Sequence, residues 1–299
     1  MKKFAAKLLG PGALSFPIWA YMVFFFVIPV LFIFYYSFGY KPDLFTPVAT
    51  DTLSLEQYQS AMSGTVLTTF LSTLRISVTG TLACLVIGVP FAYWLAVKVP
   101  PRWRNLLLAL VLVPYWTNFL VRTLGWQITL APHGYLSNWL QSLGIRDTPL
   151  DILYTPAAVQ IGVIYNYLPL MILPLFVAMD TAGRQLREAS YDLGAGRWST
   201  FSRVTMPLAM PGVMSGCLLV FVPLTGDYVT AEVLGGASGT MVGQVIANQF
   251  NTAQDWALGS AMAVTLMLMT LLVIVIAGIL FWSGKKIYER LTRVQLGLA

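Results

Sequence analysis

The sequence predicts an all-α membrane protein with six transmembrane helices and a pair of short helices between the fourth and the fifth. Three observations support this fold. Of the 299 residues, 57% are hydrophobic and only 10% are charged, whereas soluble domains carry about 25% charged residues. Uncharged stretches recur along the chain, each long enough to cross about 30 Å of hydrocarbon as a helix. Basic residues gather in alternate segments between those stretches, as membrane topology requires.

The predicted spans follow the stretches that lack Lys, Arg, Asp and Glu. Backbone inside a bilayer must satisfy its own hydrogen bonds, so each span is expected to be a helix. Five prolines fall within or near these helices and are expected to kink or interrupt them: Pro29, Pro90, Pro114, Pro169 and Pro174. Residues 233–254 are also uncharged, but their Gly, Gln and Asn content makes them too polar to span. The spans, within one transmembrane domain of residues 1–299, are 13–38, 66–97, 105–131, 152–179, 206–227 and 257–283.

The distribution of basic residues predicts the orientation of the chain. Fourteen of the eighteen Lys and Arg residues fall on one side of the predicted bundle. The other side has only Lys41 and Arg146, together with eight acidic residues. Both termini are therefore expected to face the cytoplasm of a multi-pass inner-membrane protein. The fourteen are Lys2, Lys3, Lys7, Lys98, Arg102, Arg104, Arg184, Arg187, Arg197, Arg203, Lys285, Lys286, Arg290 and Arg293.

A short amphipathic helix is predicted between the third and fourth spans. Leu136, Trp139, Leu140 and Leu143 recur there at helical spacing in an otherwise polar stretch. Such a helix is expected to lie on the outer surface of the membrane.

The segment between the fourth and fifth spans has the pattern of two short helices. The first carries an apolar face and, on another side, the i, i+4 row of Arg184, Glu188 and Asp192. Gly194 and Gly196 can end this helix and turn the chain sharply. A second short helix is expected over about 198–204, and Pro207 opens the fifth span. The apolar face comprises Leu186, Ala189 and Leu193. On these residues alone, an ordinary solvated loop is an equal alternative.

A motif in this segment resembles the EAA signature of bacterial ABC importer permeases. The matching residues are Glu188, Ala189, Ser190, Asp192, Gly194, Phe201, Pro207 and Pro211, with Ser190 in place of the second alanine of the signature. The six predicted spans, with this loop between the fourth and fifth, also fit that family. The resemblance implies that residues 184–204 form a coupling loop, which docks on a cytoplasmic ATPase and transmits its closure to the membrane helices.

Two further stretches resemble the first membrane subunit of the spermidine/putrescine importers. These are residues 113–126, from Val113 to Trp126, and residues 225–236, from Thr225 to Gly236. This resemblance implies import of polyamines or a related small organic cation by alternating access. Importers of iron, sulfate and other solutes have related stretches, so a permease for a different solute stays open as an alternative.

Several residues near the outer ends of the spans are candidates for the substrate pathway. Asp227 and Glu232 could attract a cation that enters from outside. Four aromatic residues could line a cation–π path for alkylammonium groups: Tyr115, Trp116, Tyr165 and Tyr167. The alternatives are a solvated glycine-rich turn for the carboxylates and ordinary interfacial positions for the aromatic rings.

Two arginines lie near or inside apolar stretches, where an unpaired charge is costly. Arg75 is expected to extend toward the outer interface. For Arg122 there are two interpretations: a structural ion pair, with Asp227 as the suggested partner, or a gate residue.

The sequence offers no basis for catalysis by this chain. It has one histidine, His133, and lacks the H-E-x-x-H, G-x-S-x-G and G-x-x-x-x-G-K-[ST] motifs. Cys84 and Cys217 lie inside apolar runs and are expected to be packing residues, so no metal site is predicted. All basic residues except Arg75 and Arg122 lie in segments outside the spans, so no nucleic acid is expected as a partner. An ion-coupled carrier or channel is the alternative from another class, but no Asp, Glu or His lies in the core of any span.

The family resemblance therefore implies an assembly. Without a phosphate-binding loop, the chain is expected to need no cofactor of its own, and ATP and Mg would be bound by a partner ATPase. The implied partners are a cytoplasmic ATPase dimer, a second homologous permease, an extracytoplasmic solute-binding protein and the surrounding membrane lipid.

Cysteine labelling in intact bacterial cells tests the predicted orientation. In a chain that carries Cys84→Ala and Cys217→Ala, Ser142→Cys should react with a membrane-impermeant maleimide, because the positive-inside rule places residue 142 outside. Ser199→Cys should react only after the cells are permeabilised. The reverse labelling pattern would contradict the topology.

Overall fold

The computed structural model describes residues 11–43, 45–181 and 183–296. Within these residues every regular element is a helix, and the only β pairing is an isolated antiparallel bridge between Tyr40 and Ala49. The prediction of an all-α membrane protein is confirmed. Lys2, Lys3 and Lys7, which contribute to the predicted orientation, lie outside the described residues.

The chain divides into two compact units, and the first comprises Met1–Leu67 and Ile246–Met269. Its α2 (Pro11–Met22) continues through a π-helical turn (Val23–Val27) into α3 (Ile28–Tyr36). The short helix α4 (Glu56–Ala61) follows, and the hydroxyl groups of Ser37 and Tyr58 lie 2.7 Å apart. No residue of Val23–Val27 or Ile28–Tyr36 is buried, although the stretch Phe16–Tyr36 is apolar enough to span a membrane.

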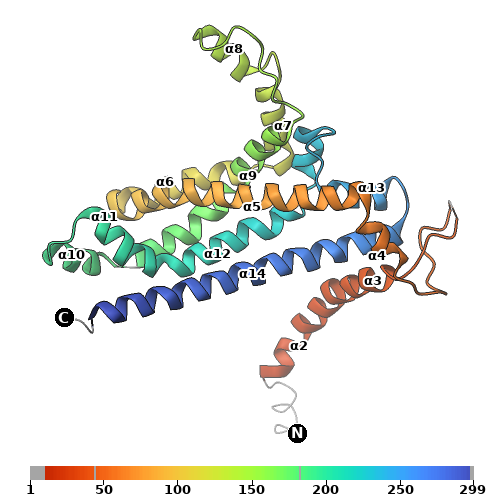
Figure 1. Cartoon of the computed structure of the whole chain (residues 1–299), viewed down its shortest axis with the longest axis horizontal. Helices are drawn as coiled ribbons and strands as arrows, with labels where there is room; N and C mark the ends of the chain where they lie inside the picture. The colour runs from red at the N-terminus through yellow and green to blue at the C-terminus, as the bar shows by residue number, and fades with distance from the viewer. Residues whose placement is uncertain (1–10, 44, 182, 297–299) are drawn as a thin grey trace. The chain divides into compact units, whose positions relative to one another are not determined.

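The second unit comprises Thr68–Val245 and Thr270–Ala299 and contains most of the long helices. The helices α5 and α14 cross the boundary between the units, whereas α9 and α12 lie entirely in the second unit and run side by side (Figure 1). Five described helices are long and apolar enough to cross a membrane, or six if one bent pair counts as a span. One of the five is the stretch Phe16–Tyr36 of the first unit. The other four contain α5 (Gly64–Tyr93, extended by a π-helical turn Trp94–Lys98), α9 (Pro156–Thr181), α12 (Met206–Thr225) and α14 (Trp256–Leu296).

Glycines on α12 allow it to pack directly on α9. A Cβ atom at Gly212 would lie 2.6 Å from the Pro174 carbonyl oxygen, and one at Gly216 would lie 2.9 Å from the Met171 sulfur. Both distances are too short for a larger side chain. Met171 and Leu175 are fully buried in the same contact region, and they belong to the hydrophobic core of this unit.

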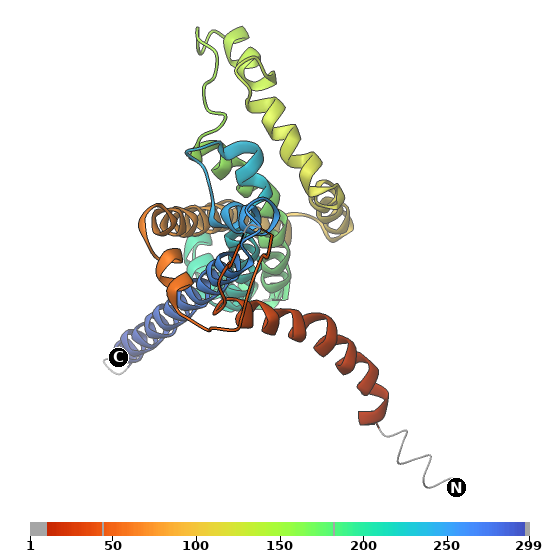
Figure 2. The same ribbon diagram turned by 90° about the vertical axis from the view of Figure 1, so that its right-hand side faces the viewer.

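The predicted third span, 105–131, is wrong as a single helix. α6 (Pro101–Trp116) and α7 (Phe119–Leu130) are separate helices, and the chain bends by 87° at the break between them. Figure 2 shows α6 nearly end-on while α7 runs across the view. Thr117 is extended, and Asn118 begins the new helix by accepting a hydrogen bond from the Leu120 backbone N–H at 2.8 Å. A side-chain cap of this kind fixes a helix start and so completes the break that Pro114 permits.

The predicted separate helix at 198–204 is also wrong. α11 (Arg197–Thr200) runs through a π-helical turn (Phe201–Thr205) into α12, so Arg197–Thr225 is one continuous helix. Proline lacks a backbone N–H and its ring crowds the preceding turn. The π-helical turn lies where Pro207 would disturb regular hydrogen bonding, which explains why the helix continues past it.

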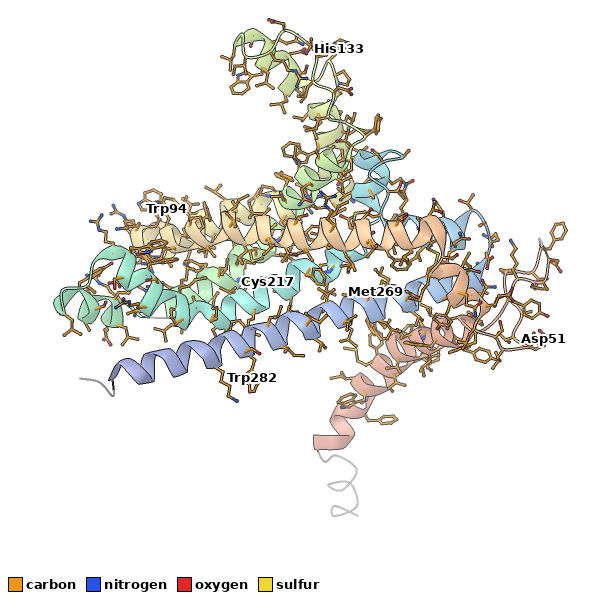
Figure 3. All side chains as sticks on the ribbon, in the orientation of Figure 1. Asp51, Trp94, His133, Cys217, Met269 and Trp282 are labelled. Carbon is orange, nitrogen blue, oxygen red and sulfur yellow. The ribbon has the colours of Figure 1, made fainter. Side chains whose placement is uncertain are left out.

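Other elements lie close to their predicted positions, but two helices, α4 and α13, were not predicted. The amphipathic helix is α8 (Tyr135–Ser142), and the first loop helix is α10 (Arg184–Asp192). Helix α13 (Val242–Asn251) was not predicted, because its polar composition argued only against a span. Cys84 and Cys217 are free, and His133 lies between α7 and α8 (Figure 3). Among the described residues, no three His, Cys, Asp or Glu side chains are grouped as metal ligands.

Candidate functional site

The segment 184–204 forms a helix–turn–helix at one end of the second unit. In Figure 1 the same end carries the junction between α5 and α6 and the C-terminal part of α14. Gly194 follows α10 with φ +82°, a left-handed conformation that favours glycine, and Gly183 precedes α10 with φ +74°. These two glycines therefore set the entry to and the exit from α10.

Two inward contacts hold this segment against α9 and α5, and a third connects its two helices with each other. The buried Arg187 donates a hydrogen bond from Nη1 to the Met179 carbonyl oxygen at 3.2 Å, which ties α10 to the end of α9. The hydroxyl groups of Ser190 and Thr200 lie 3.0 Å apart and connect α10 with α11. The Phe201 ring meets the Tyr93 ring of α5 edge-on, with centroids 5.0 Å apart. These contacts make the segment an ordered part of the unit.

The outward side of the segment presents apolar side chains to solvent. Leu186 is 53% exposed, Leu193 89% and Trp198 78%. A contiguous exposed patch of large apolar residues is typical of an interaction surface. Ala189 and Asp192, from the signature motif, are also exposed.

Glu188, the first residue of the motif, lies exposed beside this apolar surface. Its Oε1 accepts a hydrogen bond from Arg184 Nε at 2.6 Å. This hydrogen bond, together with the charge of Glu188, raises the pKa of Arg184. Since the pair is exposed to solvent, its contribution to stability is small, and Glu188 stays available to another partner.

An ion pair that the sequence did not predict lies at the same end of the unit. Arg104 Nη1 lies 2.5 Å from Asp180 Oδ1, and Arg104 Nε donates to the Val99 carbonyl oxygen at 3.0 Å. This contact joins the start of α6 to the end of α9. The predicted spans place both residues just outside the membrane on the basic side, which was the available signal for their proximity.

A second group of candidate residues surrounds the break between α6 and α7. The Arg122 guanidinium lies over the Tyr115 ring, 5.2 Å from its centroid, and 5.5 Å from the centroid of Phe119. Its Nε atom is buried and has no hydrogen-bond partner among the described residues. Cation–π contact with two rings compensates part of the cost of burying this charge. The Phe119 and Tyr167 rings have centroids 6.1 Å apart, and the Tyr167 hydroxyl lies beside Asp227. We call Tyr115, Phe119, Arg122, Asn166, Tyr167 and Asp227 the break cluster.

The suggested ion pair between Arg122 and Asp227 is wrong. The buried carboxylate of Asp227 instead accepts hydrogen bonds from Thr230, at 3.0 Å from the backbone N–H and at 2.6 Å from the hydroxyl. No described Arg or Lys lies within 4 Å of it. The short turn from 227 to 230 satisfies the carboxylate locally, and the Tyr167 hydroxyl lies beside it. Arg122 and Asp227 therefore carry opposite charges in one cluster without neutralising each other directly.

Asn166 adds an open hydrogen-bond acceptor to the break cluster. It is 1% exposed, and its Nδ2 donates to the Thr123 hydroxyl at 3.2 Å. Its Oδ1 is buried and has no partner among the described residues. Sequence reasoning missed Asn166; the available signal was an amide in the middle of the apolar span 152–179.

The remaining pathway candidates do not join this cluster by any described contact. Trp116 is 75% exposed at the end of α6. Tyr165, two residues before Tyr167, packs edge-on against Trp126 with ring centroids 5.4 Å apart. Glu232 is exposed in a π-helical turn, Ala231–Gly235.

The position of the break cluster follows from the physics of the bilayer. Interrupted backbone at membrane depth is tolerated only where it is buried in protein or lines a water-filled cavity. In transporters, discontinuous helices place their ends and unwound backbone around the transported solute. The 16 residues of α6 give a helix of about 24 Å, which places the break within or near the hydrocarbon region.

Comparison with known proteins agrees with this architecture. Residues 88–287 match the family of the binding-protein-dependent transport system inner membrane component. The spermidine/putrescine transport system permease protein PotB of Escherichia coli strain K12 is 37% identical over 275 residues, covering 92% of this chain and 98% of PotB.

Solved structures resemble the chain in fold. The crystal structure of a bacterial ABC transporter that imports the acidic polysaccharide alginate aligns with a TM-score of 0.74 at 14% identity, covering 93% of this chain and 96% of the other. The crystal structure of a bacterial alginate ABC transporter in complex with an alginate pentasaccharide-bound periplasmic protein aligns with a TM-score of 0.72 at 15% identity, covering 92% of this chain and 94% of the other.

Arg187 and Arg184 offer a matched test of how the loop is held. Arg187→Met should speed amide hydrogen exchange in α10 by roughly tenfold or more, because a hydrogen bond from a charged group contributes about 1.5–3 kcal/mol. Arg184→Met removes only an exposed helix pair and should change exchange by about twofold. Equal effects of the two substitutions on exchange, measured by mass spectrometry, would refute the assigned role of Arg187.

Proposed function

The chain belongs to the binding-protein-dependent transport system inner membrane component family, and we propose that it is the permease subunit of an ATP-driven polyamine importer. The observation that carries the substrate class is the 37% identity with PotB, which extends over 98% of that permease. In this proposal the chain forms half of the path for spermidine, putrescine or a related small organic cation. Alternating access of two such halves would move the solute inward.

The break cluster has the chemistry that an alkylammonium group requires. The carboxylate of Asp227 supplies negative charge, and the unpartnered Oδ1 of Asn166 can accept an ammonium N–H. The rings of Tyr115 and Phe119 already accommodate one cation, that of Arg122. In the proposed cycle an incoming ammonium group displaces the Arg122 guanidinium from these rings and lies beside the Asp227 carboxylate. The role of Arg122 is then that of a gate residue.

Residues 184–204 are the proposed docking site for the ATPase. Its exposed apolar side chains Leu186, Leu193 and Trp198 lie beside the exposed carboxylate of Glu188. An apolar centre with a charged rim is the usual anatomy of a protein interface. The inward contacts of Arg187 and Phe201 would pass a displacement of the dock to α9 and α5.

The proposed assembly supplies what this chain lacks. ATP and Mg would be bound by a separate cytoplasmic ATPase dimer, since the sequence has no phosphate-binding loop. A second homologous permease would complete the path, and an extracytoplasmic solute-binding protein would deliver the solute. The chain would lie in a bacterial inner membrane with both termini in the cytoplasm, because fourteen of its eighteen basic residues fall on that side.

Substitutions in the dock should uncouple the ATPase from the substrate. Glu188→Arg reverses the charge at the rim, and Gly194→Val places a β-branched residue at φ +82°, which costs about 1–2 kcal/mol. Both should abolish the stimulation of ATP hydrolysis by substrate-loaded binding protein in the reconstituted complex. Glu56→Arg, which reverses an exposed charge on α4, is the control and should retain stimulation. Normal stimulation in both dock variants would rule out this docking site.

Asp227→Asn tests the cargo. The asparagine can still accept the Thr230 N–H bond but carries no charge, so spermidine uptake by proteoliposomes that contain the complex should fall about tenfold or more. Asp147→Asn removes an exposed loop carboxylate and should leave uptake unchanged. Uptake of an anion such as sulfate by the wild-type complex, without polyamine uptake, would contradict the polyamine assignment and leave the importer family intact.

A further inference from the structure

A pocket of about 560 Å³ with a mixed polar and apolar lining opens between α5 and α9, and it shares no residue with the break cluster. Its polar lining comes from three segments of the second unit: α5, α9 and the loop after Gly236. The lining includes Ser72, Arg75, Thr79, Pro156, Gln160 and Ser238. No assigned role in the proposed transport cycle uses these residues.

The pocket presents hydrogen-bond donors and a positive charge. Arg75 is exposed, and none of the ion pairs of the described chain includes it. The Thr79 hydroxyl donates to Gln160 Oε1 at 3.0 Å, while Gln160 Nε2 is buried and has no partner among the described residues. None of the residues that line the pocket is acidic. An unpaired guanidinium next to an unpaired amide N–H favours an anion with several oxygen atoms.

The depth of the pocket identifies the source of that anion. Arg75 precedes Lys98, at the far end of the same continuous helix, by 23 residues, or about 34 Å of helix. Gln160 precedes Asp180 on α9 by 20 residues, or about 30 Å. The Lys98 and Asp180 ends mark one membrane surface, and the hydrocarbon core is about 30 Å thick. Arg75 and Gln160 therefore reach the headgroup level of the opposite leaflet, whichever way the chain is inserted.

The surface of α5 beyond Arg75 suits acyl chains. Val78, Leu82 and Val86 follow Arg75 at intervals of three or four residues, so they share its side of the helix. They are 37%, 53% and 72% exposed, respectively. This apolar strip runs from the pocket toward the middle of the membrane, as the tail of a lipid bound by its headgroup would.

We propose that this pocket binds the phosphate of a membrane phospholipid, with Arg75 as the principal contact and Gln160 Nε2 as a second donor. The exposed strip of α5 holds an acyl chain of the same lipid. This inference rests on the proposed function in one respect, the choice of leaflet. The predicted topology places the pocket in the outer leaflet. A polyamine is excluded from the pocket, because the charge of Arg75 repels a polycation.

Native mass spectrometry of the delipidated full complex tests the proposal, with phosphatidylglycerol as the titrated probe. Arg75→Gln should weaken the tightest bound phosphatidylglycerol about tenfold, the effect expected for loss of a charge-assisted hydrogen bond. Arg75→Lys keeps the charge and should give an intermediate affinity, so that loss of binding is separated from loss of folding. Arg146→Gln, which removes an exposed loop arginine, should bind like the wild type.

Two outcomes would overturn the proposal. Equal affinity of the wild type and Arg75→Gln would remove Arg75 from the site. Displacement of the lipid by inorganic phosphate, but not by a galactosyl diacylglycerol, would make the pocket a site for a free anion. The binding assay requires no transport, so phosphatidylglycerol bound at Arg75 by a complex that takes up no polyamine would support the lipid site and defeat only the proposed cargo.

Discussion

The contact between α9 and α12 positions almost every functional feature of the second unit. It depends on Gly212 and Gly216, which bring α12 against the Pro174 backbone and the Met171 side chain of α9. One helix, α9, then carries Gln160 in the lipid pocket, Asn166 and Tyr167 in the break cluster, and the end to which Arg187 and Arg104 are bound. Because protein interiors are close-packed and resist deformation, these sites keep a fixed spacing along α9. A shift of α9 against α12 would move all of them together.

Most of the spans could be predicted from the scarcity of charged residues, because the cost of a charge in hydrocarbon is large. The uncharged stretch 233–254 had to be excluded by its Gly, Gln and Asn content instead. The helix–turn at Gly194 was equally accessible, since a left-handed turn requires glycine almost regardless of context. The break at Thr117 could not be predicted from the sequence. Pro114 is compatible with a kink or with a break, and the helix cap formed by Asn118 decides between them. The continuity of Arg197–Thr225 depends on a π-helical turn, a small change in hydrogen bonding that has no sequence signature.

Two arginines illustrate how context separates similar sequence signals. Arg75 and Arg122 both lie in or near apolar stretches of the sequence. The sequence suggests an ion pair with Asp227 for Arg122 alone. The structure brings Arg122 and Asp227 into one cluster, yet Thr230 satisfies the carboxylate and two rings receive the guanidinium. A local turn costs less chain entropy than an ion pair between helices, so it competes effectively for the same carboxylate. Arg75 takes part in no ion pair of the described chain and is exposed, so its guanidinium is accessible to the proposed lipid phosphate.

The continuous helix Arg197–Thr225 gives the proposed coupling a direct mechanical route. Its 29 residues correspond to about 43 Å, from the turn that carries the proposed dock to Gly226 and Asp227. Two helices joined by a flexible loop would absorb a displacement of the dock at the loop. The helix has no such loop at this position and packs on α9. The proposed coupling would therefore carry a displacement of α11 along α12, in which Pro211 and Pro223 are the points where the helix can bend. At the far end of the helix, two hydrogen bonds from Thr230 hold the Asp227 carboxylate, and the Tyr167 hydroxyl lies beside it. In the proposed cycle, a displacement of this end frees the carboxylate for an incoming ammonium group. The sequence-based prediction separated these helices and was wrong. The continuity that it missed is the feature that best links the proposed ATPase dock to the break cluster.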